Sequence, residues 1–71
     1  MNIIYDNLTD ILYIRLDDRI QKVINKQIAN DTVLDLGKDE KLVGIEIINA
    51  SKRIKINNLL QLKDNYQKIA I

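Results

Sequence analysis

Residues 10–16, DILYIRL, and residues 42–48, LVGIEII, are the two stretches that decide the fold. In the first stretch Leu12, Ile14 and Leu16 occupy every second position, so a strand of this sequence has one wholly apolar face. Branched side chains such as Ile and Val fit a pleated surface better than a helix interior. Both stretches are therefore predicted to be strands of one sheet.

Shorter segments of the same kind flank these two strands. Residues 3–6 and 32–36 are predicted strands, and residues 6–10, 17–18 and 30–31 contain the Asp and Asn residues that favour turns. Residues 37–41 have the length of a hairpin loop. That loop predicts that Leu34 and Leu36 lie across from Val43, Ile45 and Ile47.

The segment 20–28 fits two structures. Ile20, Val23, Ile24 and Ile28 are spaced as in a helical stripe, yet three of them also share the parity of one strand face. Periodicity alone leaves both alternatives open.

The C-terminal part of the chain is predicted to be helical. Asn49 is a candidate helix cap, and Asn57 or Asn58 is a second one. The helical stripe that follows consists of Leu59, Leu62, Tyr66 and Ile69. The alternative ends this helix at residues 64–65 and makes residues 66–71 a final strand, so residues 64–71 stay open between helix and strand.

Together these segments predict a single α+β domain over residues 1–71. An antiparallel sheet of about five strands forms the β-rich core within residues 1–54, and residues 55–71 form a C-terminal α-helix or tail. A chain this short buries only about 60–65% of its unfolded surface, so a partner surface would stabilise it.

The composition excludes several kinds of chemistry. The chain has no Cys and no His, which removes disulfides, thiolate metal sites and every nucleophile activated by histidine. Asp6 and Asp10 are spaced like a carboxylate pair, but no further oxygen ligands stand near them and turn stabilisation is the preferred interpretation. We therefore expect no enzyme activity, no catalytic residue, no metal and no cofactor.

Two further observations bear on location. The N-terminal residues do not resemble a secretory signal, and charges interrupt every apolar stretch well before the roughly 18 residues of a membrane span. A cytoplasmic protein without membrane association is the expectation.

Charge is distributed unevenly along the chain. The net charge is only +1, which argues against a strongly basic nucleic-acid binder, but residues 50–71 hold five Lys and Arg against one acidic residue. Ser51, Lys52 and Arg53 at a helix start are a candidate phosphate site. Solvated basic side chains are the preferred interpretation, because no glycine-rich loop precedes them.

A set of short motifs resembles the domain of unknown function 2283 family. These motifs are Tyr5-Asp6, the strand of residues 10–16, and residues 43–53 with their Gly-Ile-Glu-Ile and Asn-Ala-Ser-Lys-Arg sequences. Asn49 stands where the family usually has Asp, and Asp17-Asp18-Arg19 where it often has an Asp-Gly hairpin. The resemblance implies a strand within residues 20–28. It implies no established activity, although some members resemble partners of small toxin-like proteins.

The sheet face opposite Leu12 is predicted to be apolar as well. A solvated face would not carry so many apolar residues, so we expect the C-terminal helix or a second subunit to cover it, with Arg15 and Glu46 as a cross-strand ion pair. With the basic turn added, the candidate interaction surface consists of Ile11, Tyr13, Arg15, Leu42, Glu46, Ile48, Lys52 and Arg53.

The function expected from these patterns is a non-enzymatic protein-interaction module that forms a homodimer. The alternative is an antitoxin-like regulator that neutralises a small toxin protein and contacts nucleic acid through its basic residues. Nucleic acid is otherwise not an expected partner.

Overall fold

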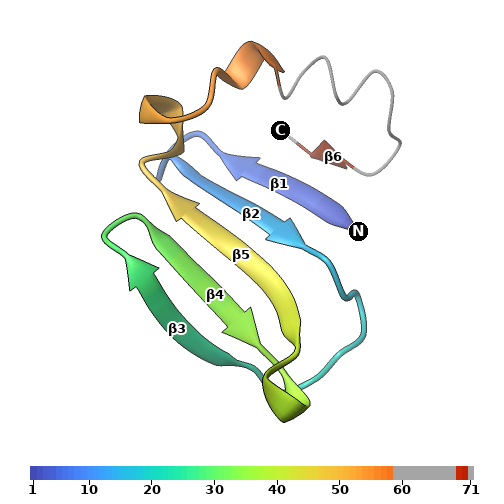
Figure 1. Ribbon diagram of the computed structural model, residues 1–71. Coiled ribbons are helices and arrows are strands. Elements are labelled where there is room, and N and C mark those ends of the chain that lie inside the picture. The colour runs from blue at the N-terminus through green and yellow to red at the C-terminus, as the bar shows by residue number, and fades with distance from the viewer. Residues whose placement is uncertain (59–68, 71) are drawn as a thin grey trace.

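One sheet organises the chain. The structure, a computed structural model, describes residues 1–58 and 69–70. Among these residues six strands lie in the order β3-β4-β5-β2-β1-β6 (Figure 1). The strands are β1 (Asn2–Asp6), β2 (Ile11–Arg15), β3 (Ile24–Ala29), β4 (Thr32–Leu36), β5 (Leu42–Ile48) and β6 (Ile69–Ala70). The first five pair antiparallel, which confirms the predicted five-stranded sheet, and β6 pairs parallel with β1.

Strand register confirms the main cross-strand prediction. Leu34 lies opposite Ile45, and Ile45 lies opposite Ile14 on the other side of β5. Side chains at paired positions share a face of the sheet. A register shift after Asp35 then pairs Leu36 with Leu42.

The predicted loops are found at residues 37–41 and 30–31. In the first, the 3₁₀ helix η1 (Lys38–Glu40) forms the turn, and the Gly37 amide donates to the Lys41 carbonyl at 2.8 Å. The second loop is the tight connection between β3 and β4. These loops make β3, β4 and β5 a continuous antiparallel meander.

The ambiguous segment 20–28 contains a strand, not a helix. Residues 20–23 have no regular structure, and β3 begins at Ile24. All six residues of β3 are exposed, so pairing with β4 rather than burial fixes this segment as a strand. The outcome agrees with what the family resemblance implied.

The chain leaves β5 through a short turn. Asn49 has a φ of 54°, in the left-handed region that Asn tolerates, and the 3₁₀ helix η2 (Ala50–Lys52) follows. The prediction that the Asn49 side chain caps this helix is wrong, because it makes no capping hydrogen bond. Its backbone conformation reverses the chain instead, and the Ala50 amide then donates to the Asp10 carbonyl at 2.9 Å.

Of the segment predicted as a C-terminal helix or tail, the structure describes residues 55–58 and 69–70. Residues 56–58 are helical, so Asn57 and Asn58 lie within this turn and do not cap it. The stripe residues Leu59, Leu62 and Tyr66 lie outside the described residues. Ile69 and Ala70 belong to β6, as the alternative of a final strand predicted for this end of the chain.

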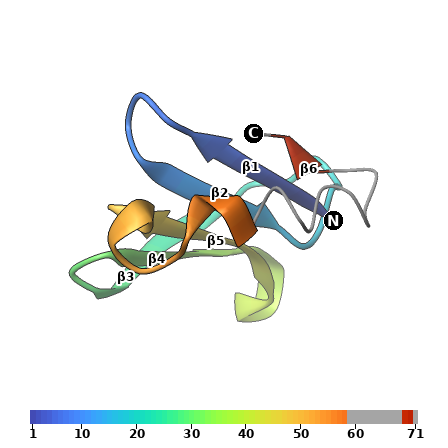
Figure 2. The ribbon, with the colours of Figure 1, turned by 90° about the horizontal axis from the view of Figure 1, so that it is seen from above.

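The core lies on one face of the sheet, which we call the first face. Its centre is formed by Leu12, 1% exposed, and Ala50, fully buried. The apolar side chains packed against them are Ile3, Tyr5, Ile14, Ile47, Ile54 and Ile56. Residues 50–58 lie where β1 ends and β2 begins, beside β2 and β5 in the second view (Figures 1 and 2). The described part of the C-terminal segment therefore covers the first face. The rest of the predicted helix, which was expected, with a second subunit as the alternative, to cover the opposite face, lies mostly outside the described residues.

No helix within residues 1–58 and 69–70 is long and apolar enough to cross a membrane.

Candidate functional site

The opposite side of the sheet, which we call the second face, carries a polar cluster. Strand pairing aligns its residues in rows across the sheet. One row is Asn2, Arg15, Gly44, Asp35 and Asn25; the next is Ile4, Tyr13, Glu46, Val33 and Gln27. Ile11 and Ile48 are paired in a third row. Polar residues thus occupy the middle of this face, with apolar residues toward β1 and β2.

Tyr13 lies across Gly44 to reach Asp35. Its hydroxyl donates to Asp35 Oδ2 at 2.9 Å, although Tyr13 belongs to β2 and Asp35 to β4, with β5 between them. A Cβ at Gly44 would lie only 2.7 Å from the Tyr13 hydroxyl oxygen. A glycine within a strand often marks a place where another group approaches the backbone closely. Here the group is the Tyr13 phenol, which lies in the space that a side chain at Gly44 would occupy.

Asp35 is the centre of the cluster. It is 5% exposed, and its other carboxylate oxygen accepts a hydrogen bond from the Asn25 side-chain amide at 2.5 Å. Burial raises the pKa of Tyr13, and the hydrogen bond to Asp35 raises it further. The pKa of Glu46 is also raised, first by burial and then by the neighbouring carboxylate of Asp35. Both causes disfavour the charged form of the Glu46 side chain.

The hydrogen bonds of the cluster hold the Asp35 side chain in place. Asp35 has a donor on each carboxylate oxygen, so it is held in place rather than left available as a base. Among residues 1–58 and 69–70, no group of three or more acidic side chains could hold a metal ion. A fixed, internally bonded polar centre with apolar side chains beside it has the composition of an interface.

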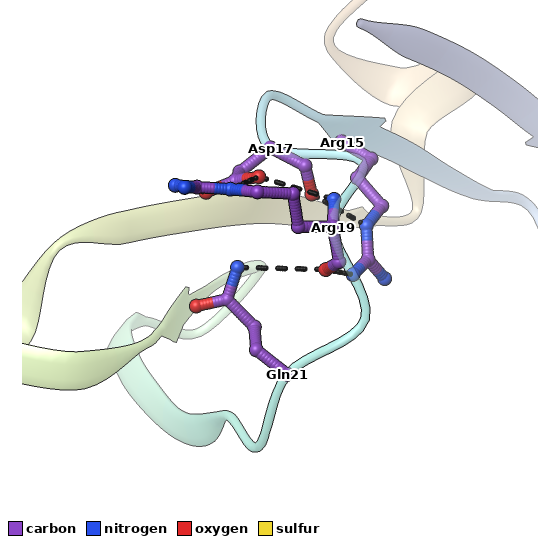
Figure 3. Close-up of polar contacts among 4 residues, drawn as sticks. All are labelled: Arg15, Asp17, Arg19 and Gln21. Carbon is purple, nitrogen blue, oxygen red and sulfur yellow. Dashed lines mark hydrogen bonds and ion pairs between the residues drawn. The ribbon is translucent and has the colours of Figure 1, made fainter.

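Arg15 does not pair with Glu46, and that prediction is wrong. Its Nε donates to the Asp17 carbonyl at 2.8 Å and its Nη2 to the Arg19 carbonyl at 3.0 Å (Figure 3). Register explains the difference, because Arg15 lies opposite Gly44 while Glu46 lies opposite Tyr13. Arg15 therefore holds the loop after β2 and takes no part in the cluster.

The same loop contains an ion pair. Arg19 Nε and Nη2 donate to the two carboxylate oxygens of Asp17 at 2.9 and 2.7 Å (Figure 3). These side-chain bonds, together with the Arg19 amide, lower the pKa of Asp17 well below its usual range. The prediction that acidic residues stabilise this loop agrees with the contacts of Asp17, whereas Asp18 accepts hydrogen bonds from the N-terminal amine and from Asn2.

Asp10 joins both ends of the family motif. Its carboxylate accepts hydrogen bonds from the Ser51 hydroxyl at 2.6 Å, the Ser51 amide at 3.0 Å and the Tyr5 hydroxyl at 2.7 Å. The Ser51 and Tyr5 side chains lower the pKa of Asp10. Asp6 accepts the Leu8 amide at 3.0 Å. Asp6 therefore stabilises a turn, in agreement with the preferred interpretation, and Asp10 fastens η2 to the sheet.

The structure brings together only part of the predicted interaction surface. Ile11, Tyr13, Glu46 and Ile48 share the second face, half-buried. Leu42 lies opposite Leu36 after the register shift and does not continue that face. Arg15, the last residue of β2, donates its side-chain hydrogen bonds to the loop described above.

Lys52 and Arg53 do not adjoin the polar cluster. They follow Ala50 at the turn that covers the first face. Arg53 Nη1 lies 3.3 Å from Asp31 Oδ2 and 3.2 Å from the Thr32 hydroxyl. The predicted phosphate site at this turn therefore has one cation already engaged.

Asp35 and Asn25 are the members of the cluster that sequence reasoning missed. Asp35 stands between Leu34 and Leu36, so the alternation places it on the opposite face of the strand and does not show that it is buried. The available signal was its position in an inner strand, where a charged side chain faces neighbours on both sides. The partner from β3 could be found only after that segment was known to be a strand.

Comparisons with known proteins identify the family and nothing beyond it. No curated protein and no solved structure matches the chain. Most of the motifs on which the resemblance rested lie within β1, β2, β5 and the Asp10–Ser51 contact described above. Residues 2–51 match the family described as protein of unknown function DUF2283, and the chain therefore belongs to that family.

Proposed function

We propose that this protein is a non-enzymatic interaction module that forms a homodimer through the second face of its sheet. The observation that carries the proposal is that this face combines apolar side chains with a polar centre whose hydrogen bonds are already made. The first face has its own cover in residues 50–56.

The apolar part of the second face lies over β1, β2 and β5. Ile4 is 46% exposed, and Ile11, Tyr13 and Ile48 are half-buried. The molecule measures 35 × 28 × 16 Å. The outline of its broad side, 35 × 28 Å, therefore has a larger area than the roughly 800 Å² of surface that each partner contributes to a stable complex.

The polar centre suits burial beneath a second copy. Unpaired polar groups oppose association because they lose water without gaining a partner. Asp35 already accepts bonds from Tyr13 and Asn25, and no side-chain nitrogen or oxygen buried within the described residues lacks a partner. Tyr13 adds a large aromatic side chain of the kind that dominates binding energy at interface centres.

Light scattering after size-exclusion chromatography tests the proposal. We expect a molar mass near twice the chain mass of 8.3 kDa, falling toward that of the monomer on dilution. A monomer at every concentration, together with the absence of any partner in a pull-down from the host, would contradict it.

An antitoxin-like regulator is the second candidate. The observation that favours it is the exposed basic run of Lys52, Arg53 and Lys55. Fluorescence anisotropy with DNA and RNA oligonucleotides at increasing salt tests the contact, which should weaken as salt rises. This candidate also requires an adjacent reading frame that encodes a small toxic protein, and without either observation it fails.

Two coarser proposals accompany these. We place the protein in the cytoplasm, and we assign it to the α+β class on the helical turn at residues 56–58. A fluorescent fusion tests the first, and the helical content from circular dichroism tests the second.

A further inference from the structure

Three strongly exposed apolar side chains lie in β3 or shortly before it, at one edge of the sheet. Ile20 is fully exposed, Ile24 is 74% exposed and Ile28 is 55% exposed. β3 is the last strand in the sheet order, so among the described residues its outer edge is unpaired. An edge strand presents free backbone amides and carbonyls to any extended chain that approaches it.

A groove adjoins the start of this edge. It consists of two neighbouring hollows of about 400 and 470 Å³, between the loop of residues 17–23 and the turn of residues 37–41. Gln21 and Lys38 line both hollows. The apolar lining residues are Ile20, Val23, Ile24 and Leu36. The apolar lining of the groove is therefore continuous with the start of β3, whose outer edge is unpaired among the described residues.

The rim of the groove is basic. Lys22, Lys38 and Lys41 line it and all three are exposed, whereas Asp39 is an acidic lining residue that forms no ion pair with another described residue. Arg19 and Asp17 also line it, but they neutralise each other. Lys26, in the middle of β3, adds a fourth cation. An occupant of matching charge carries acidic side chains.

A second copy of the chain does not fit this edge. Two β3 strands paired antiparallel about a twofold axis place Lys26 opposite itself, opposite Ile24 or opposite Ile28, depending on register. β3 contains no acidic residue, so every register leaves Lys26 without a counter-charge. Lysine on an edge strand is a common device against self-pairing.

We propose that β3 and its groove bind an extended segment of a partner protein in which Asp or Glu alternates with branched apolar residues. The segment adds a strand to the sheet beside β3, its apolar side chains lie over Ile20 and Ile24, and its carboxylates lie near Lys22 and Lys38 at the rim of the groove. The inference rests on the proposed role as an interaction module and states the chemistry of its partner.

The probe is a fluorescein-labelled octapeptide of alternating Glu and Val or Ile, titrated with the full chain and followed by anisotropy. A matched peptide with Lys in place of Glu is the control. We expect the Glu peptide to bind at least about tenfold more tightly than the Lys peptide. Hydrogen exchange should show slower exchange at the β3 amides and no change at β1.

A charge-reversal variant gives a result that loss of folding cannot produce, because it should gain affinity for the opposite peptide. The double variant Lys22→Glu/Lys38→Glu should prefer the Lys peptide, because the rim has changed sign. The matched control Lys52→Glu/Lys55→Glu makes the same charge change away from the groove and should bind as the wild type does.

Several results would overturn the inference. In the anisotropy titration these are equal binding of the two peptides, no binding of either peptide, and competition by a DNA oligonucleotide of the same affinity. An equal effect of the two double variants on peptide binding would also overturn it, as would β3 amides that self-association already protects from hydrogen exchange. The outcome is separable from that of the homodimer proposal. A dimer that binds no peptide overturns only this inference, and a monomer that binds the Glu peptide overturns only the homodimer.

Discussion

Replacing Gly44 with Ala tests the packing at the centre of the second face. The new Cβ would lie 2.7 Å from the Tyr13 hydroxyl oxygen, 3.0 Å from Tyr13 Cζ and 3.1 Å from the Ile14 carbonyl oxygen. The Ile14 contact is with backbone in an inner strand, so Tyr13 must move. Its hydrogen bond to Asp35 is then lost.

The expected cost follows from three contributions. Overpacking costs about 1–3 kcal/mol, and losing a hydrogen bond to a buried charged group costs about 1.5–3 kcal/mol. Ala also reduces the conformational entropy of the unfolded chain, which stabilises the folded protein by about 0.4–1 kcal/mol. The net loss of about 1.5–5.5 kcal/mol is a large part of the roughly 4–11 kcal/mol typical of a domain of this size.

Urea unfolding of a double-mutant cycle measures the effect. Gly44→Ala should lower the free energy of unfolding in the wild type and cost at least about 1 kcal/mol less in a Tyr13→Phe background, where the hydroxyl is absent. Gly37→Ala is the control, since a Cβ there would meet Gln21 and Val43, and its cost should not depend on Tyr13. If the costs of Gly44→Ala and Tyr13→Phe sum to the cost of the double variant within about 0.5 kcal/mol, the proposed geometry is refuted.

Three further substitutions test the core and the two carboxylates. Leu12→Ala should cost about 2–5 kcal/mol in chemical unfolding, because Leu12 is 1% exposed, and a smaller loss would mean that the core is packed differently. Asp10→Asn should lower the unfolding midpoint at neutral pH. The folded pKa of Asp10 is lowered, so its contribution is present above the unfolded value of 3.8 and is lost as pH falls through the folded value. A gap between wild type and variant that persists at the lowest pH would contradict this. Glu46→Gln should stabilise the protein at neutral pH. The raised pKa of Glu46 means that stability is present below the unfolded value of 4.5 and is lost as pH rises through the folded value, so a destabilised variant would contradict the assignment.

Much of the sheet could be predicted from the sequence because period-two patterning fixes both the strand and its inner face. Leu34 faces Ile45 as predicted, since a short hairpin loop sets the register of the strands that it joins. The prediction failed at Leu42, because one residue of register shift moves a side chain away from its expected partner. Asn49 was assigned a side-chain cap, but its left-handed backbone conformation is what reverses the chain.

The candidate site was harder to predict than the fold. Pattern placed Tyr13 and Glu46 on one face, but it could not show that Tyr13 reaches past its neighbour to Asp35 two strands away. Such diagonal contacts depend on the order of the strands in the sheet. The alternation of apolar and polar residues does not reveal that β5 lies between β4 and β2. Arg15 shows the same limit, since loop carbonyls compete for a guanidinium that sequence reasoning assigned to Glu46.

The molar mass of one matched pair of variants most directly tests whether the second face is adhesive. Ile48→Glu places a charge within that face, whereas Leu8→Glu makes the same kind of change at a side chain that is 92% exposed in the turn after β1. Light scattering at a concentration where the wild type is dimeric should give a monomer for Ile48→Glu and a dimer for Leu8→Glu, with both variants folded by circular dichroism. A folded Ile48→Glu variant that keeps the wild-type mass would contradict the account.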